Sequence, residues 1–143
     1  MLEELYCRGF CRFYSGGARG FDLLAAERIS AMQARHADIR LLLALPHPGQ
    51  SSRWTDKDIT RYEYTIYRAD ETHVLSQHYY HGCMMVRNRY MVDRSSLCLC
   101  YLNKASGGTK STVEYAAKKG LQVVNLAKPK TCSSYVMDLM GVT

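Results

Sequence analysis

The stretch CRFYSGGARGFDLLAAERISAMQARHADIRLLLALP, residues 11–46, contains a complete strand–helix–strand pattern. Residues 11–14 predict a strand and residues 15–20 a glycine-rich turn. Residues 21–35 predict an amphipathic helix, because their apolar positions recur every three or four residues. The nearly continuous apolar run at 39–45 predicts a strand that helices cover on both faces. Two strands joined by a crossover helix in this way indicate a parallel sheet.

The same alternation continues to residue 126. Three further strands are predicted, at 72–76, 97–101 and 121–126. Four further helices are predicted, at 2–8, 55–68, 83–93 and 109–119, with Thr55 as the N-cap of the second. This order predicts an α/β fold, a Rossmann-like three-layer domain with a mainly parallel sheet of about five strands and helices on both faces. We expect one domain over residues 1–143, in which 129–143 form a C-terminal tail.

The composition limits the class of protein. With 143 residues, 47% of them hydrophobic, the chain has the size and composition of one globular domain, not of a disordered or collagen-like protein. No apolar run approaches the roughly 20 residues that span a bilayer, and the first residues lack the layout of a signal peptide, so we expect a cytoplasmic protein without a membrane partner. The formal charge of +6 suits a polyanionic ligand. The six cysteines form no CxxC pair, so we expect reduced thiols and predict neither a metal site nor a cofactor.

Two glycine-rich segments follow predicted strands, and parallel α/β folds bind ligands beyond the carboxyl ends of their strands. They are SGGARGFD at 15–22 and SGGTKSTVEYA at 106–116. Glycines let the backbone approach a ligand closely, and free N–H groups at a helix start attract phosphate. The alternative is a pair of tight turns, in which Asp22 only complements a helix dipole. Two such segments at one sheet edge favour a phosphate or ribose site.

Several motifs occur in the order of a known group of proteins. The segment SGGARGFDLLAAE at 15–27 resembles the SGxAxGxD segment of the SLOG superfamily, a Rossmann-like group that includes DNA-processing protein A and the LOG phosphoribohydrolases. Pro46-x3-Gln50-x3-Trp54, RNRYMVD at 87–93 and GGTKSTVEYA at 107–116 are similar to its YpsA/YoqJ-like branch. The resemblance extends from about residue 2 to residue 126.

The resemblance also implies an earlier strand with a Gly-His-Arg signature, before the first helix. Residues 1–143 contain no such segment. A parallel sheet without that inner strand is expected to expose apolar surface and unpaired backbone groups. Either the chain is a truncated form, or a partner covers these groups. A homo-oligomer is one such arrangement.

The resemblance implies a site for a nucleotide or an ADP-ribose-like ligand. Phosphate contacts are expected from Gly16, Gly17, Gly107, Gly108 and Thr109, with Arg19 or Arg87 neutralising the charge. Asp22 is expected to accept a hydrogen bond from ribose. The other candidate ligand-binding residues are Ser15, Gln50, Trp54, Asn88 and Thr112. A lone tryptophan such as Trp54 is more often a packing residue than a platform for a base.

Two alternative functions follow from the same resemblance. LOG enzymes hydrolyse the N-glycosidic bond of a nucleoside monophosphate, and Arg87 and Glu114 match the spacing of their catalytic residues, although Lys110 replaces a glycine of their loop. Without catalysis, Glu114 would be a helix-surface residue and Arg87 would pair with a nearby acid. Binding of single-stranded DNA ranks third, because the basic residues are scattered and no aromatic track is evident.

Overall fold

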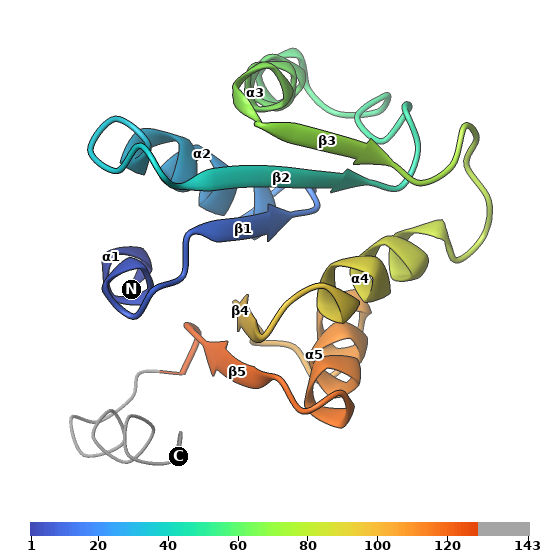
Figure 1. Ribbon diagram of the computed structural model, residues 1–143. Coiled ribbons are helices and arrows are strands. Elements are labelled where there is room, and N and C mark those ends of the chain that lie inside the picture. Colours follow the sequence, from blue (N-terminus) through green and yellow to red (C-terminus); the bar gives the residue numbers. More distant parts are fainter. Residues whose placement is uncertain (129–143) are drawn as a thin grey trace.

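The computed structural model describes residues 1–128, in which helices and strands alternate (Figure 1). The helices are α1 (Leu2–Cys7), α2 (Phe21–Met32), α3 (Asp56–Arg68), α4 (Cys83–Asp93) and α5 (Gly108–Lys118). The strands are β1 (Arg12–Ser15), β2 (Arg40–Leu45), β3 (Glu71–Val74), β4 (Leu97–Cys100) and β5 (Gln122–Asn125). Every element predicted from the sequence is present, although α2 ends at Met32 and not at Arg35. The predicted tail, 129–143, lies outside the described residues.

The five strands pair only in parallel, which confirms the α/β, Rossmann-like class. They form two sheets where the sequence predicted one: a three-stranded sheet in the order β1-β2-β3 and a two-stranded sheet, β4-β5. The division falls between β1 and β4, which are not paired with each other. Both strands line a cavity that separates the two sheets.

Strand β2 is the centre of the core. Leu41, Leu43 and Leu45 pack with Ile29 of α2 and Tyr62 of α3 in one hydrophobic cluster. The intervening residues of β2 point to the opposite face and are also inaccessible to solvent. Full burial of each leucine stabilises the fold by roughly 1.5–3 kcal/mol. Helices therefore cover both faces of β2, as its apolar sequence predicts.

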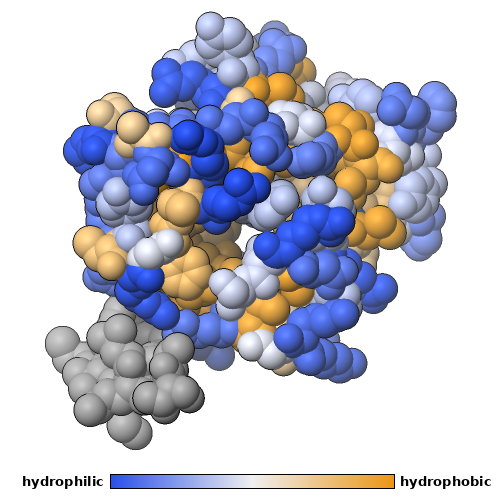
Figure 2. Space-filling view, in the orientation of Figure 1, coloured by the Kyte–Doolittle hydropathy of each residue, from blue (hydrophilic) through white to orange (hydrophobic). Residues whose placement is uncertain are grey.

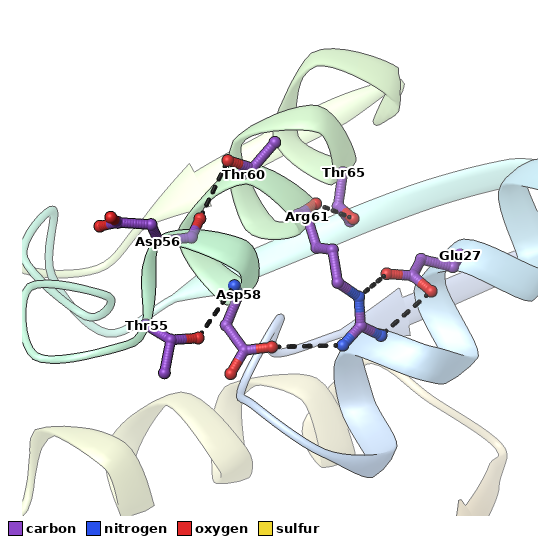
Figure 3. Close-up of polar contacts among 7 residues, drawn as sticks. All are labelled: Glu27, Thr55, Asp56, Asp58, Thr60, Arg61 and Thr65. Atoms are coloured by element: carbon purple, nitrogen blue, oxygen red, sulfur yellow. Dashed lines mark hydrogen bonds and ion pairs between the residues drawn. The ribbon is translucent and has the colours of Figure 1, made fainter.

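Helix α3 is held at its start and along its side (Figure 3). Thr55 is its N-cap, and the Thr55 side chain accepts a hydrogen bond of 3.3 Å from the Asp58 backbone N–H, which confirms the predicted cap. The guanidinium of Arg61 donates two hydrogen bonds, of 2.7 and 3.2 Å, to the two carboxylate oxygens of Glu27 on α2. This bidentate pair ties the two helices that cover the same face of the three-stranded sheet.

Across residues 1–128, no helix combines the length and the apolar character that crossing a membrane requires.

Candidate ligand-binding site

The first glycine loop leaves the carboxyl end of β1 and enters α2. Ser15 organises it: its hydroxyl donates to the Asp22 carbonyl at 3.0 Å and accepts from the Gly17 N–H at 3.1 Å. Gly17 has a φ of 63°, in the left-handed region that favours glycine, and a Cβ there would lie 3.1 Å from the Tyr62 ring. The loop is therefore a tight turn whose shape its own side chains maintain.

The side chain of Arg87, which belongs to α4, contacts this loop. It is 3% exposed, and its Nη1 donates to the Gly16 carbonyl at 2.6 Å and to the Ala44 carbonyl at 3.3 Å. The same nitrogen donates to Gln50 Oε1 at 3.2 Å. Within the described residues, Nη2 has only the Met84 sulfur as an acceptor, at 4.0 Å. Because sulfur is a weak acceptor, Nη2 keeps donor capacity for an anion.

A chain of hydrogen bonds links the two glycine loops. Arg87 Nε donates to Asn88 Oδ1 at 2.7 Å, and Asn88 Nδ2 donates to Thr112 Oγ1 at 2.9 Å. The Thr112 hydroxyl donates to the Gly108 carbonyl at 2.8 Å. Through these side chains the loop after β1 and the loop after β4 are held at the same edge of the fold.

Asp22 is a partly buried residue whose carboxyl group lies beside Arg87. Burial raises its pKa above the ordinary value of 3.8, and this effect outweighs the guanidinium of Arg87 and the backbone N–H groups of Ala18 and Gly16, which act in the opposite direction. Gly16 lies between the two charged groups. A Cβ at Gly16 would be 2.4 Å from Arg87 Nη1 and 2.8 Å from Asp22 Oδ2, so any other residue there would have to displace one of these two side chains.

These groups border a cavity of about 670 Å³, which we call the central cavity. Figure 2 shows a hollow with hydrophobic residues in its walls at the place where Figure 1 shows the space between β1 and β4. Nine of the fourteen residues predicted from the sequence line the cavity: Ser15, Gly16, Arg19, Asp22, Arg87, Asn88, Gly108, Thr109 and Thr112.

The remaining five predicted residues do not line it. Gly17 contacts Tyr62, and Gly107 is the N-cap of α5. Gln50 is buried and donates to the Gly16 carbonyl and the Tyr62 hydroxyl, both at 3.2 Å. Gln50 therefore supports the loop without lining the cavity.

Trp54 and Glu114 also lie away from the cavity. The Trp54 ring packs edge-on against the Tyr62 ring, with 5.1 Å between centroids. Glu114 is exposed on α5, with its carboxylate 3.7 Å from the Lys110 ammonium. An N-glycosidase would require Glu114 and Arg87 in one pocket. In this conformation the two residues do not share one.

Two aromatic residues at the cavity were not among the sequence candidates. The rings of Phe21 and Tyr101 are stacked, with 6.4 Å between centroids and 27° between planes, and both line the cavity. Tyr101 is 50% exposed. The sequence could have pointed to these two residues, because Phe21 directly follows the first glycine loop and Tyr101 directly follows β4.

The fold and this site define a class: a Rossmann-like α/β protein whose glycine loops meet at the carboxyl ends of parallel strands. The particular family follows from comparison with known proteins. The family model described as the YspA SLOG family matches residues 1–127, and the chain belongs to that family.

Relatives of this chain occur in Bacillus. It is similar to a UPF0398 protein of Bacillus cereus (strain B4264), with 28% identity over 107 residues that cover 73% of this chain and 58% of the relative. It is also similar to the uncharacterized SPbeta prophage-derived protein YoqJ of Bacillus subtilis (strain 168), with 27% identity over 131 residues, 82% of this chain and 77% of the relative. The chain thus spans less than two thirds of the Bacillus cereus protein.

Proposed function

We propose that the loop end of the central cavity, bordered by Gly16 and Gly108, binds a nucleotide or an ADP-ribose-like molecule. The observation that carries this proposal is the link from Gly16 through Arg87, Asn88 and Thr112 to Gly108. It holds two helix-opening loops together around a buried cation that has unused donors.

The anionic part of the ligand would lie at these loops. The first turns of α2 and α5 supply backbone N–H groups that prefer a negative charge. Arg87 Nη2 and the exposed Arg19 add positive charge on the cavity wall. Thr109 adds a hydroxyl at the start of α5.

The uncharged part of the ligand would extend toward the aromatic pair. A purine ring can stack on the half-exposed Tyr101, whose other neighbour is Phe21. Asp22 lines the same cavity as this pair and Arg87, and its carboxyl group could accept a hydrogen bond from a ribose hydroxyl. A phosphate, a sugar and a base can therefore each find a partner of matching chemistry.

Calorimetric titration with ADP-ribose, NAD and a panel of nucleoside monophosphates tests the proposal. We expect one of these compounds to bind, and Arg19→Ala to weaken that binding about ten- to a hundredfold, the effect of losing one charge-assisted hydrogen bond. Arg53→Ala is the matched control, because Arg53 is exposed and lies outside the cavity.

The outcomes separate binding from catalysis. Binding without release of free base supports the proposal, and Glu114→Gln should then leave the affinity unchanged, because Glu114 lies outside the cavity. Release of base that Glu114→Gln abolishes would replace the proposal with an N-glycosidase. No heat with any compound, or equal losses in Arg19→Ala and Arg53→Ala, would refute it.

A further inference from the structure

A second cavity lies between α2 and α3, and we call it the interhelix pocket. Its volume is about 210 Å³, and the residues that line it are Glu27, Ser30 and Ala31 of α2 and Tyr64, Thr65 and Arg68 of α3. None of these residues lines the central cavity. A cavity of roughly 150 Å³ can hold one benzene molecule, so the interhelix pocket has room for a small ring that carries one polar group.

The hydroxyl group of Ser30 is buried without a partner. Ser30 is 9% exposed, and within residues 1–128 its Oγ forms no hydrogen bond. A buried polar group of this kind costs free energy, and most such groups bond to a neighbour, a water molecule or a ligand. Because no hydrogen bond fixes this hydroxyl, a rotation about the Cα–Cβ bond can turn it toward the interhelix pocket. Ser30 therefore offers a free donor at the wall of the pocket.

The charged residues of the interhelix pocket favour an anion. Among the described residues that line it, Glu27 is the only acid, and both of its carboxylate oxygens already accept hydrogen bonds from Arg61, at 2.7 and 3.2 Å (Figure 3). The exposed Arg68 also lines the pocket, and within residues 1–128 no salt bridge joins it to an acidic side chain. The negative charge at the pocket is therefore balanced within the protein, whereas the positive charge is not.

The remaining residues of the interhelix pocket suit a ring. Ala31 and Thr65 contribute methyl groups. The ring of Tyr64 is stacked with that of Tyr67, with 6.4 Å between centroids, and Tyr64 is 59% exposed. A neighbour thus already supports the Tyr64 ring, and an aromatic ligand can pack against its accessible part.

We propose that the interhelix pocket binds a small aromatic carboxylic acid in its ionised form. The ring would pack against Tyr64, and the carboxylate would accept hydrogen bonds from the Ser30 hydroxyl and the Arg68 guanidinium. Binding would break no ion pair of Arg68 and no hydrogen bond of Ser30 within the described part of the chain. The proposal does not depend on the nucleotide site, because the two cavities share no residue.

Titration of the full chain with sodium benzoate, followed by NMR, tests this. We expect the amide signals of Ala31 and Thr65 to shift with a dissociation constant of about 1 mM or lower, a range that a ligand of this size can reach. Nuclear Overhauser effects should connect the ring protons of benzoate with the methyl groups of the same two residues. Benzamide has nearly the same shape without the charge, and it should bind about tenfold more weakly or worse, because a hydrogen bond to a charged group is the stronger kind.

The variant Ser30→Ala separates ligand binding from folding. Since the hydroxyl has no partner in the free protein, its removal should cost no stability in urea unfolding, and alanine is also the better helix former. The affinity for benzoate should nevertheless fall about three- to tenfold, because the ligand loses one donor. A residue with only a packing role would not show this combination.

The variant Arg68→Gln tests the charge of the interhelix pocket. The affinity for benzoate should fall about ten- to a hundredfold, the effect of losing one charge-assisted hydrogen bond. Arg28→Gln is the matched control, because Arg28 is an exposed residue of α2 that does not line the pocket. It should leave the affinity unchanged.

Several results would overturn the proposal. Unchanged signals of Ala31 and Thr65 up to about 10 mM benzoate would mean that the interhelix pocket holds water at most. Equal affinities for benzoate and benzamide, or equal losses in the two arginine variants, would refute a carboxylate site. A loss of stability in Ser30→Ala would show that its hydroxyl already has a partner in solution. Overhauser effects to residues of the central cavity alone would assign benzoate to that cavity instead.

Discussion

The carbonyl oxygen of Gly16 accepts a hydrogen bond of 2.6 Å from Nη1 of Arg87, a residue 71 positions further along the chain. The same nitrogen also donates to the carbonyl of Ala44 at the end of β2. One buried guanidinium thus positions the loop after β1, the end of β2 and the start of α4. The shape of the candidate site therefore depends on Arg87 even before any ligand binds.

Replacing Gly16 tests how closely the side chains of Arg87 and Asp22 approach it. In Gly16→Ala, the new methyl group would lie 2.4 Å from Arg87 Nη1 and 2.8 Å from Asp22 Oδ2. We expect the free energy of unfolding to fall by about 1–3 kcal/mol, the usual cost of overpacking. Gly108→Ala is the control: nothing lies within 4 Å of a Cβ there, so urea unfolding should show no loss. Equal losses in both variants would contradict the close approach at Gly16.

Removing the guanidinium tests its structural role directly. Arg87→Met keeps much of the side-chain volume but leaves the Ala44 carbonyl and Gln50 Oε1 without this donor, while the Gly16 carbonyl keeps only its hydrogen bond from Gln50. We expect a loss of about 3 kcal/mol in urea unfolding, since each buried group left unpaired costs about 1–3 kcal/mol. Arg87→Lys keeps the charge but not the planar, forked shape of the guanidinium. Its stability should lie between those of the wild type and Arg87→Met. A loss below about 1 kcal/mol in Arg87→Met would show that the loop holds its shape without Arg87.

The partly buried carboxyl group of Asp22 predicts a pH dependence of stability. Because burial raises its pKa in the folded state, the folded protein keeps this proton to higher pH than the unfolded chain does. The contribution of Asp22 to the free energy of unfolding is therefore full below its ordinary pKa of 3.8 and decreases as the pH rises through the raised pKa. Asp22→Asn removes this decrease.

Urea unfolding of the wild type and of Asp22→Asn over a series of pH values measures the effect. The stability of the variant minus that of the wild type should increase with pH, because only the wild type loses the Asp22 contribution. In Arg87→Met the decrease should extend to higher pH, because Arg87 lowers the pKa of Asp22. A difference between wild type and Asp22→Asn that stays constant with pH would contradict the raised pKa.

The N-cap of α3 gives a prediction outside the site. Thr55→Ala removes the acceptor of the Asp58 N–H and should cost about 1 kcal/mol of stability. Thr60→Ala is the matched variant on the same helix, because the Thr60 hydroxyl donates only to the Asp56 carbonyl and Thr60 is exposed. It should be neutral or slightly stabilising, since alanine is the better helix former. If thermal unfolding shows the same loss for both, the cap at Thr55 contributes nothing specific.

Local patterns were sufficient to predict the order of elements. The apolar run at 39–45 predicts a strand covered on both faces, and Thr55 followed by two acidic residues predicts the start of α3. Such features depend on neighbours a few residues apart, through helix and strand periodicity and capping hydrogen bonds. For the same reason the glycine segments could be placed correctly between a strand and a helix.

Part of the candidate site could be predicted from the sequence, and part is visible only in the tertiary structure. The resemblance to LOG enzymes offers Arg87 and Glu114 as a catalytic pair for the alternative function, yet in the structure Arg87 is buried against Gly16 and Glu114 faces solvent beside Lys110. Trp54 packs on Tyr62 instead of lining the cavity, while Tyr101, which no motif marked, lines it. Spacing along a helix does not decide which of its faces meets the rest of the fold.

The sequence alone determined the α/β class, the ten elements and the loops that form the candidate site, because these follow from interactions between residues close along the chain. Only the tertiary structure decided that the strands divide into two sheets with the central cavity between β1 and β4, and that Arg87 joins Gly16 to Ala44. Those relationships depend on how crossover helices bring distant segments together, and no local pattern encodes that distance.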